Sequence, residues 1–363
     1  MVSATKTIES VLLYGDKGLH RDPFLSIVIP TRNRLGLLKE SILSAINQED
    51  APVDYEVVIA DNCSDDDVCE NIRLFLEDLG ADNVYYYRNT ENIGLYQNWN
   101  RSIELARSKW AAMLHDDDLL YGDYVKTMSN IIRRHKITPE NTSYIKTRFT
   151  ESPDHGPVVV RDIERGGIIA RVKKAFRYAV IEIKPSDMDN LGPLNEGLMG
   201  AQTCGSLINR DYAISKGGFD PSLYPSSDVV FATDLVYSND RKVYTTLNST
   251  GRYRIICNTQ MLPETIRLYA DRYEGRKEFF RSSSRRYAGQ LAKMEKVYNA
   301  IARRTLLMNL AGRDEEIADH IKEKTEPCEA NEALVIMEER KIQKRIKRMY
   351  LRGFLDIKAL LGK

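Results

Sequence analysis

Apolar and polar positions alternate in regular blocks from residue 25 to about residue 135. Four short apolar runs have the length and composition of buried strands: LSIVIPT (25–31), YEVVIAD (55–61), NVYYYRN (83–89) and WAAMLHDD (110–117). Each is followed by a segment with apolar side chains at helical spacing: 35–48, 65–80, 94–108 and 121–135. This alternation predicts an α/β fold, in which a mostly parallel sheet is flanked by helices on both faces.

The carboxyl ends of the four predicted strands are all polar. They read Pro30-Thr31-Arg32-Asn33, Asp61-Asn62, Arg88-Asn89 and His115 to Asp118. Parallel sheets bind ligands at this edge. We therefore expect these strand ends to converge on one functional site.

The pattern changes after residue 140. Residues 141–190 are irregular and predict an insertion or an acceptor-side segment, whereas 203–220 predict a strand, a short helix and a glycine turn. Residues 226–239 predict a helix, and the chain from 271 onward has a largely helical, charged pattern. The predicted division is an N-terminal extension (1–24), a catalytic domain (25–270, in halves 25–125 and 126–270) and a helical, basic C-terminal region (271–363).

Composition narrows the class of protein. The 53 basic and 52 acidic side chains give a formal net charge of +1, which argues against general nucleic-acid binding. The five cysteines are scattered and form no C-x-x-C pair, so we expect buried, reduced thiols. Because no signal-peptide pattern and no apolar run of about 18 residues occur, the expected location is the cytoplasm.

Asp116, Asp117 and Asp118 are the strongest chemical signal in the chain. Three adjacent carboxylates at the end of a buried strand repel one another unless a positive charge lies nearby. Mg²⁺ or Mn²⁺ supplies such a charge and binds carboxylate, phosphate and water oxygens. The alternative is an acidic cap for the following helix, since Asp is favoured there.

Several motifs, in order and spacing, resemble the inverting family 2 glycosyltransferases with the GT-A fold. They are LSIVIPTRNR, VVIADNCSDD, NTENIGLYQNWNRSIELA, AMLHDDDLL and GSLINRDYAISKGGFD, and the resemblance runs from about Leu25 to Leu235. AMLHDDDLL matches the family's DXD metal motif. The resemblance implies nucleotide-sugar binding, a Mg²⁺ or Mn²⁺ cofactor and the synthesis of bacterial surface polysaccharide.

Positions carry over residue by residue. The resemblance implies that Asp118 ligates the metal, that Asp116 holds the ribose or metal-bound water or ligates the metal itself, and that Asp117 is the alternative ligand. Asp61 would accept a hydrogen bond from the nucleobase, although it could also cap the turn that follows it. The full predicted donor site is Pro30, Thr31, Arg32, Arg34, Asp61, Asn92, Gly94, Asn98, Asp116 and Asp117.

The catalytic base is predicted to be Asp228. Inversion requires a group that removes the proton of the acceptor hydroxyl, and the family places it in a Glu-Asp pair shortly after Gly-Gly-Phe-Asp. Here the pair reads Ser227-Asp228, so the usual Glu is replaced. Asp220 belongs to the turn and is expected to be structural, and Asp234 should point away from the sugar.

The predicted partners are a nucleotide-sugar donor, with UDP as the expected nucleotide, and a glycan or lipid-linked acceptor. The alternatives are a binding protein of the same fold that has lost catalysis, or a nucleotidyltransferase, for which RNRLGLLKE would be a poor phosphate loop. Residues 340–363 carry nine basic residues and one acidic residue with apolar positions at helical spacing. We predict that this tail binds an anionic membrane surface at the inner face of the cell membrane; a helix packed on the catalytic domain is the alternative.

Overall fold

The computed structural model describes residues 9–15, 22–152, 178–187, 203–224, 227–254 and 315–324. The predicted basic tail (340–363) lies outside these residues. Two compact units can be distinguished. The first contains the sheet and the predicted donor site; the second includes residues 181–187, 227–242 and 315–324 among those described.

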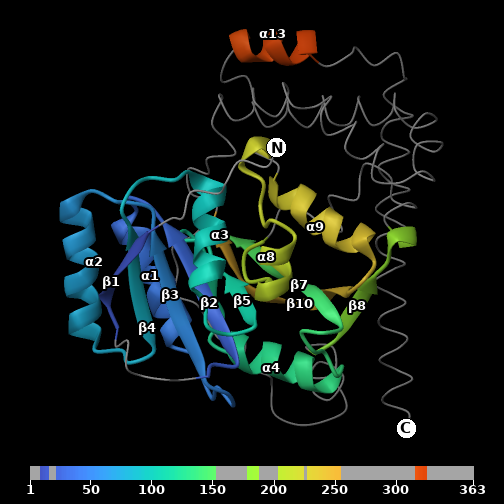
Figure 1. Cartoon of the computed structure of the whole chain (residues 1–363), viewed down its shortest axis with the longest axis horizontal. Coiled ribbons are helices and arrows are strands. Elements are labelled where there is room, and N and C mark those ends of the chain that lie inside the picture. The colour runs from blue at the N-terminus through green and yellow to red at the C-terminus, as the bar shows by residue number, and fades with distance from the viewer. Residues whose placement is uncertain are drawn as a thin grey trace. The chain divides into compact units, whose positions relative to one another are not determined.

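Parallel strands form the centre of the sheet, as predicted (Figure 1). They are β2 (Leu25–Thr31), β3 (Tyr55–Asp61), β4 (Val84–Asn89) and β5 (Trp110–Met113). β3 lies between β2 and β4, and β5 lies on the other side of β2. All residues of β2 and β5 are buried, which explains why these runs are apolar on both faces.

Helices flank this sheet. They are α1 (Leu35–Ile46), α2 (Asp66–Leu79), α3 (Leu95–Leu105) and α4 (Tyr124–Arg134). α1 and α2 pack side by side, whereas α3 contacts β2 and β3. Because the crossover through α3 runs back across the sheet and parallel crossovers are right-handed, α3 covers the face opposite α1 and α2.

Antiparallel strands extend the sheet on both sides. They are β1 (Ser10–Tyr14), β6 (Leu119–Leu120), β7 (Thr142–Ser152), β9 (Leu207–Asn209) and β10 (Lys242–Arg254), in the order β1-β4-β3-β2-β5-β9-β7-β10-β6. β1, β7 and β10 were not predicted. The prediction of irregular structure for 141–190 is therefore wrong over β7 and over β8 (Val180–Ile183).

The remaining elements are short. α8 (Arg210–Ser215) and the 3-10 helix η2 (Pro221–Leu223) belong to the first unit, and α9 (Ser227–Ser238) and α13 (Glu315–Lys324) to the second. The strand, short helix and glycine turn predicted for 203–220 and the helix predicted for 226–239 are confirmed. Among the described helices, none has the length and apolar character needed to span a bilayer.

The core lies between the parallel strands and the helices. Trp99 and Trp110 belong to this core and are 8% and 3% exposed. Cys69 and Cys204 are buried free thiols, as predicted, and Cys63 is a half-buried one. Burying one Ile, Leu or Val side chain contributes about 1.5–3 kcal/mol, so this core gives the loops at the sheet edge a rigid base.

Candidate active site

The carboxyl ends of the parallel strands meet along one edge of the sheet, as predicted. Thr31, the last residue of β2, lies beside Asp61 of β3, which in turn lies beside Arg88 of β4. On the other side of β2, the N–H of Leu114 donates to the carbonyl of Val28 at 2.9 Å. The segment that follows, beginning at His115, is thereby brought to the same edge.

A topological switch point lies between β2 and β5. The chain passes from β2 through β3 to β4 and then returns to place β5 on the opposite side of β2. Open α/β sheets bind ligands at such a point. The two sides are linked there, because the hydroxyl of Thr31 donates to Oδ2 of Asp116 at 2.7 Å.

Asp116 and Asp117 share one guanidinium at this switch point. Nη1 of Arg34 lies 2.7 Å from Oδ2 of Asp117 and 3.3 Å from Oδ1 of Asp116. The Asp117 and Asp116 side chains are 19% and 10% exposed, and that of Arg34 is 33% exposed. Burial raises the pKa of Asp116 to about 6, although the charge of Arg34 opposes this shift. We call these three side chains, of which Arg34 and Asp117 are partly exposed and Asp116 is buried, the Arg34–aspartate cluster.

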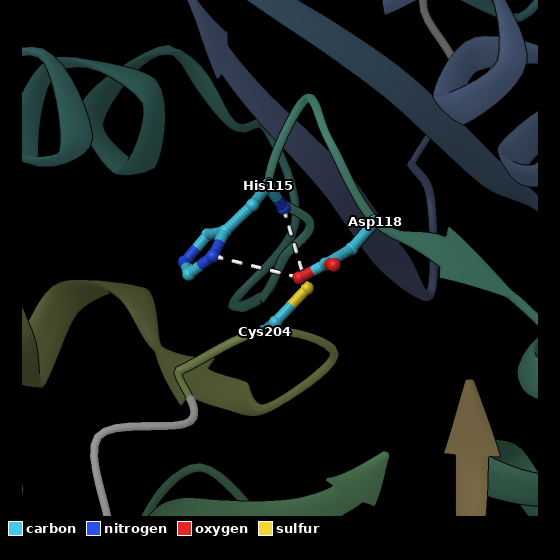
Figure 2. A group of neighbouring side chains, drawn as sticks. All are labelled: His115, Asp118 and Cys204. Atoms are coloured by element: carbon cyan, nitrogen blue, oxygen red, sulfur yellow. Dashed lines mark hydrogen bonds and ion pairs between the residues drawn. The ribbon is translucent and has the colours of Figure 1, made fainter. Parts of the chain in front are cut away.

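Asp118 has different surroundings and is fully buried. Its Oδ1 accepts the backbone N–H of Arg254 at 2.9 Å, whereas its Oδ2 has no hydrogen-bond partner within the described part of the chain. Nδ1 of His115 lies 3.7 Å from Oδ2, and Cys204 completes a group in which one ligand atom from each of the three residues lies within 4.8 Å of the other two (Figure 2). Burial, followed by the charge of Asp117, raises the pKa of Asp118 to about 7.

The backbone of the aspartate loop is held by residues that the sequence analysis missed. The hydroxyl of Ser41 lies 2.9 Å from the carbonyl of Asp116 and 2.7 Å from that of Asp118. The guanidinium of Arg254, at the end of β10, donates to the carbonyl of Asp117 and to the carboxylate of Glu40. These contacts fix the loop between α1 and β10.

A polar stripe on α1 is the sequence feature from which these contacts to the aspartate loop could have been predicted. Ser41, Ser44 and Gln48 follow one another at three- and four-residue spacing, which places them on one side of the helix. Oγ of Ser44 accepts the N–H of Leu120 at 3.2 Å, and Nε2 of Gln48 donates to the carbonyl of Tyr121 at 3.1 Å. The stripe therefore binds the backbone that follows the aspartates.

Arg254→Met tests the bracing, because it keeps side-chain length and removes the charge and the donors. We expect a loss of about 3 kcal/mol in the free energy of unfolding, the usual scale for removing one partner of a buried ionic contact. Chemical denaturation measures it. The matched control is Arg252→Met, on the same strand and half-buried. Equal unfolding free energies for the two variants would show that Arg254 does not brace the loop.

Asp61 is used within the fold. Its Oδ1 accepts the N–H and the hydroxyl of Ser64 at 2.9 and 2.6 Å, and its Oδ2 accepts the hydroxyl of Tyr86 at 2.6 Å. The capping role expected for Asp61 is therefore confirmed. Recognition of a nucleobase by this carboxylate, which is 0% exposed, stays a prediction.

Asn92, Gly94 and Asn98 shape the entry to α3. The side-chain oxygen of Asn92 accepts Nδ2 of Asn62 at 2.8 Å and the N–H of Gly94 at 3.1 Å. Gly94 has φ 89°, and a Cβ there would lie 2.7 Å from a neighbouring side chain, so this position requires glycine. Asn98 is 3% exposed and donates to the carbonyl of Ala60 at 2.9 Å. Their contact with a nucleotide stays a prediction.

Pro30 and Arg32 flank Thr31. Pro30 is buried within β2 and lies beside Ala60 of β3, whereas Arg32 is exposed just after the strand. Of these two predicted donor-site residues, Arg32 is thus the one with a side chain open to a ligand. Its role, like that of Pro30, remains a prediction.

The predicted glycine turn is present. Gly217 and Gly218 have φ 86° and 65°, and a Cβ on Gly218 would lie 2.2 Å from Oδ1 of Asn100. The carboxylate of Asp220 caps η2 by accepting the N–H of Ser222 at 2.8 Å. This is the structural role expected for Asp220.

Asp228 lies in the first turn of α9, in the second compact unit, and is 3% exposed. Asp234 lies on the same helix and is exposed. The two carboxylates therefore have different surroundings. The assignment of Asp228 as the base remains a prediction.

Comparison with known proteins agrees with the motifs. Residues 26–153 match the family described as glycosyl transferase family 2. The chain is 31% identical over 115 residues to a PGL/p-HBAD biosynthesis glycosyltransferase of Mycobacterium bovis, covering 31% of this chain and 43% of that protein. It is 34% identical over 99 residues to an abequosyltransferase of Salmonella typhimurium, covering 27% and 29%. The match thus spans less than half the length of either relative.

The fold has a counterpart among solved structures. A mannosyltransferase from Pyrobaculum calidifontis, solved in complex with GDP-Man and Mn²⁺, aligns with a TM-score of 0.50 at 14% identity, covering 95% of this chain and 89% of that one. This likeness concerns the fold. It supports a GT-A fold for this chain, and residues 26–153 match glycosyl transferase family 2.

Proposed function

We propose that this chain transfers a sugar, with inversion, from a nucleoside-diphosphate sugar to a hydroxyl of a glycan or lipid-linked acceptor in bacterial surface polysaccharide synthesis. The observation that carries the proposal is the Arg34–aspartate cluster, with Arg34 and Asp117 partly exposed, at the switch point of a family 2 domain. The names of the Salmonella and mycobacterial relatives support a glycosyl transfer.

The donor's diphosphate fits this cluster electrostatically. Arg34 is one-third exposed and comes from the loop directly after β2. A guanidinium presents several donors in a planar fork, which suits phosphate oxygens. Arg34 now offsets the charge of Asp116 and Asp117, and we propose that it turns to the diphosphate when the donor binds.

The same carboxylates fit Mg²⁺ or Mn²⁺. Such hard cations bind one or two carboxylates and complete their shell with water and phosphate oxygens, so they need an accessible site. The exposure of Asp117 beside Asp116 favours this pair as ligands over the fully buried Asp118. When bound, the cation would offset charge developing on the leaving diphosphate. The Mn²⁺ in the Pyrobaculum mannosyltransferase supports the use of a divalent cation.

Asp228 is the proposed base. A carboxylate can remove the proton of the acceptor hydroxyl as that oxygen attacks the anomeric carbon. Burial in the first turn of α9 keeps water from this side chain. Ser227 replaces the Glu usual in the family, so Asp228 would act here without a neighbouring carboxylate at that position.

Thermal shift with a panel of nucleotide sugars tests the proposal. We expect UDP-sugars to raise the Tm in the presence of Mn²⁺, because a ligand present at 100 times its Kd stabilises the folded state by about 2.7 kcal/mol. GDP-, CDP- and dTDP-sugars and free ATP complete the panel. Asp66→Asn is the control, since Asp66 is an exposed carboxylate outside the cluster. If ATP raises the Tm and none of the nucleotide sugars does, the proposal is contradicted.

A further inference from the structure

His115, Asp118 and Cys204 form a second group of potential ligands, separate in chemistry from the Arg34–aspartate cluster. Figure 2 shows the three side chains facing one another, and their ligand atoms all lie within 4.8 Å of one another. Asp118 and Cys204 are 0% exposed. The group thus offers one nitrogen, one oxygen and one sulfur in a buried position.

Oδ2 of Asp118 is buried between the ring of His115 and the thiol of Cys204. Buried polar atoms are almost always hydrogen-bonded, and in the described residues Oδ2 of Asp118 meets no N–H or O–H donor; the side-chain donor beside this carboxylate is the thiol of Cys204, which donates only weakly. Nε2 of His115 lies 3.0 Å from the hydroxyl of Thr203. In the tautomer in which Nε2 carries the hydrogen, the lone pair of Nδ1 faces Oδ2.

The distances suit a shared cation. The 3.7 Å between Nδ1 and Oδ2 is too long for a hydrogen bond. It is close to the separation of two ligands bound tetrahedrally to one ion at about 2.0–2.2 Å. Nδ1 of His115 and Oδ2 of Asp118 both carry lone pairs that face each other, and a cation between the two atoms would be bound by both.

The surrounding contacts hold the ligands in place. Trp99 stacks on the His115 ring at a centroid distance of 4.8 Å, and the Thr203 contact fixes its other nitrogen. The backbone N–H of His115 donates to Sγ of Cys204 at 3.3 Å, a contact that favours the thiolate. Thr147 donates to the carbonyl of Cys204 at 3.1 Å.

We propose that His115 Nδ1, Asp118 Oδ2 and Cys204 Sγ bind a thiophilic divalent cation of the Zn²⁺ class. Three protein ligands leave a fourth position for water, and a thiolate with an imidazole selects Zn²⁺ over Mg²⁺. Binding replaces the thiol S–H bond with an S–metal bond and releases one proton to water. The thiolate and the carboxylate together neutralise the ion's charge.

Cobalt absorption tests the site without measuring activity. In a Cys257→Ser/Cys328→Ser background, we expect one equivalent of Co²⁺ to produce a thiolate-to-metal charge-transfer band that Zn²⁺ abolishes and Mg²⁺ does not. Cys204→Ser should remove the band. Cys63→Ser is the matched control, since Cys63 is a free thiol outside the group, and it should retain the band.

Two further variants complete the test. His115→Gln should weaken Co²⁺ binding about tenfold or more, because even residues that only hydrogen-bond to a metal ligand contribute that much to metal affinity. If Cys204→Ser does not fold, this variant tests the site in its place. Asp117→Asn should keep the band, which separates this site from the proposed donor site. No band in the background protein, or a band that survives Cys204→Ser, would overturn the proposal.

Discussion

Asp117→Asn is expected to lower the rate of sugar transfer about a hundredfold or more. The substitution is nearly isosteric but removes the carboxylate that, with Asp116, we propose as cation ligand. Losing one group that stabilises charge on a leaving oxygen typically costs a factor of about 10²–10³. Transfer rates measured over a Mn²⁺ titration should show a weaker apparent Mn²⁺ affinity, and excess EDTA should abolish transfer by the wild type.

Asp118→Asn and Asp66→Asn are the comparison variants for Asp117→Asn. Asp118 is fully buried, so its variant asks whether the ligand is the third aspartate, as the sequence motif first implied, or the second. Asp66, exposed and paired with Arg88 near the same edge, controls for loss of a nearby charge. Wild-type transfer by Asp117→Asn, or wild-type activity in EDTA, contradicts the metal proposal.

Asp228→Asn is expected to reduce turnover about a hundredfold or more while leaving donor affinity nearly unchanged. General-base catalysis contributes about 10²–10⁴ to the rate, and the amide removes the proton acceptor with little change in shape. Steady-state kinetics with saturating donor gives the turnover, and titration calorimetry gives the donor affinity.

Asp234→Asn is the matched control on the same helix. Asp234 is exposed and Asp228 buried, so the control should transfer sugar at the wild-type rate. An active Asp228→Asn beside an inactive Asp234→Asn would assign the base to the other carboxylate. Equal loss of donor affinity and turnover in Asp228→Asn would indicate a role in donor binding.

The sequence predicted the part of the fold in which local pattern and position coincide. β2 and β3 begin and end where their apolar runs do, and α2 is capped by Gly80, the last residue of its predicted helical segment, in the left-handed conformation. Because parallel strands share one direction, their polar carboxyl ends had to meet. That argument needed no knowledge of which strands were neighbours.

What escaped prediction depends on pairing between distant segments. β1 pairs with β4 and β10 with β6, and neither short-range periodicity nor turn chemistry encodes such partners. The same holds for Arg254, whose buried guanidinium reaches α1 and the aspartate loop from more than a hundred residues away. The role of Arg254 can be inferred only when the position of β10 in the sheet is known.

Within the aspartate loop, too, the sequence could not predict which side chains lie close to which distant residues. The sequence alone could not separate Asp117 from Asp118 as the metal ligand. The structure describes a partly exposed Asp117 that shares Arg34 with Asp116, and a fully buried Asp118 beside His115 and Cys204. Cys204 lies far along the chain, so the sequence analysis read it as an ordinary buried thiol.

Release of nucleoside diphosphate from a bound donor tests the central claim most directly. The donor is the one selected by thermal shift, and the products with Mn²⁺ or EDTA are separated by ion-exchange chromatography. The account predicts Mn²⁺-dependent release of the nucleoside diphosphate, slow with water and faster with a hydroxyl acceptor, and no release in EDTA. Donor binding without any release would indicate a binding protein, and pyrophosphate formed from a nucleoside triphosphate and a sugar phosphate would indicate a nucleotidyltransferase; either result contradicts the account.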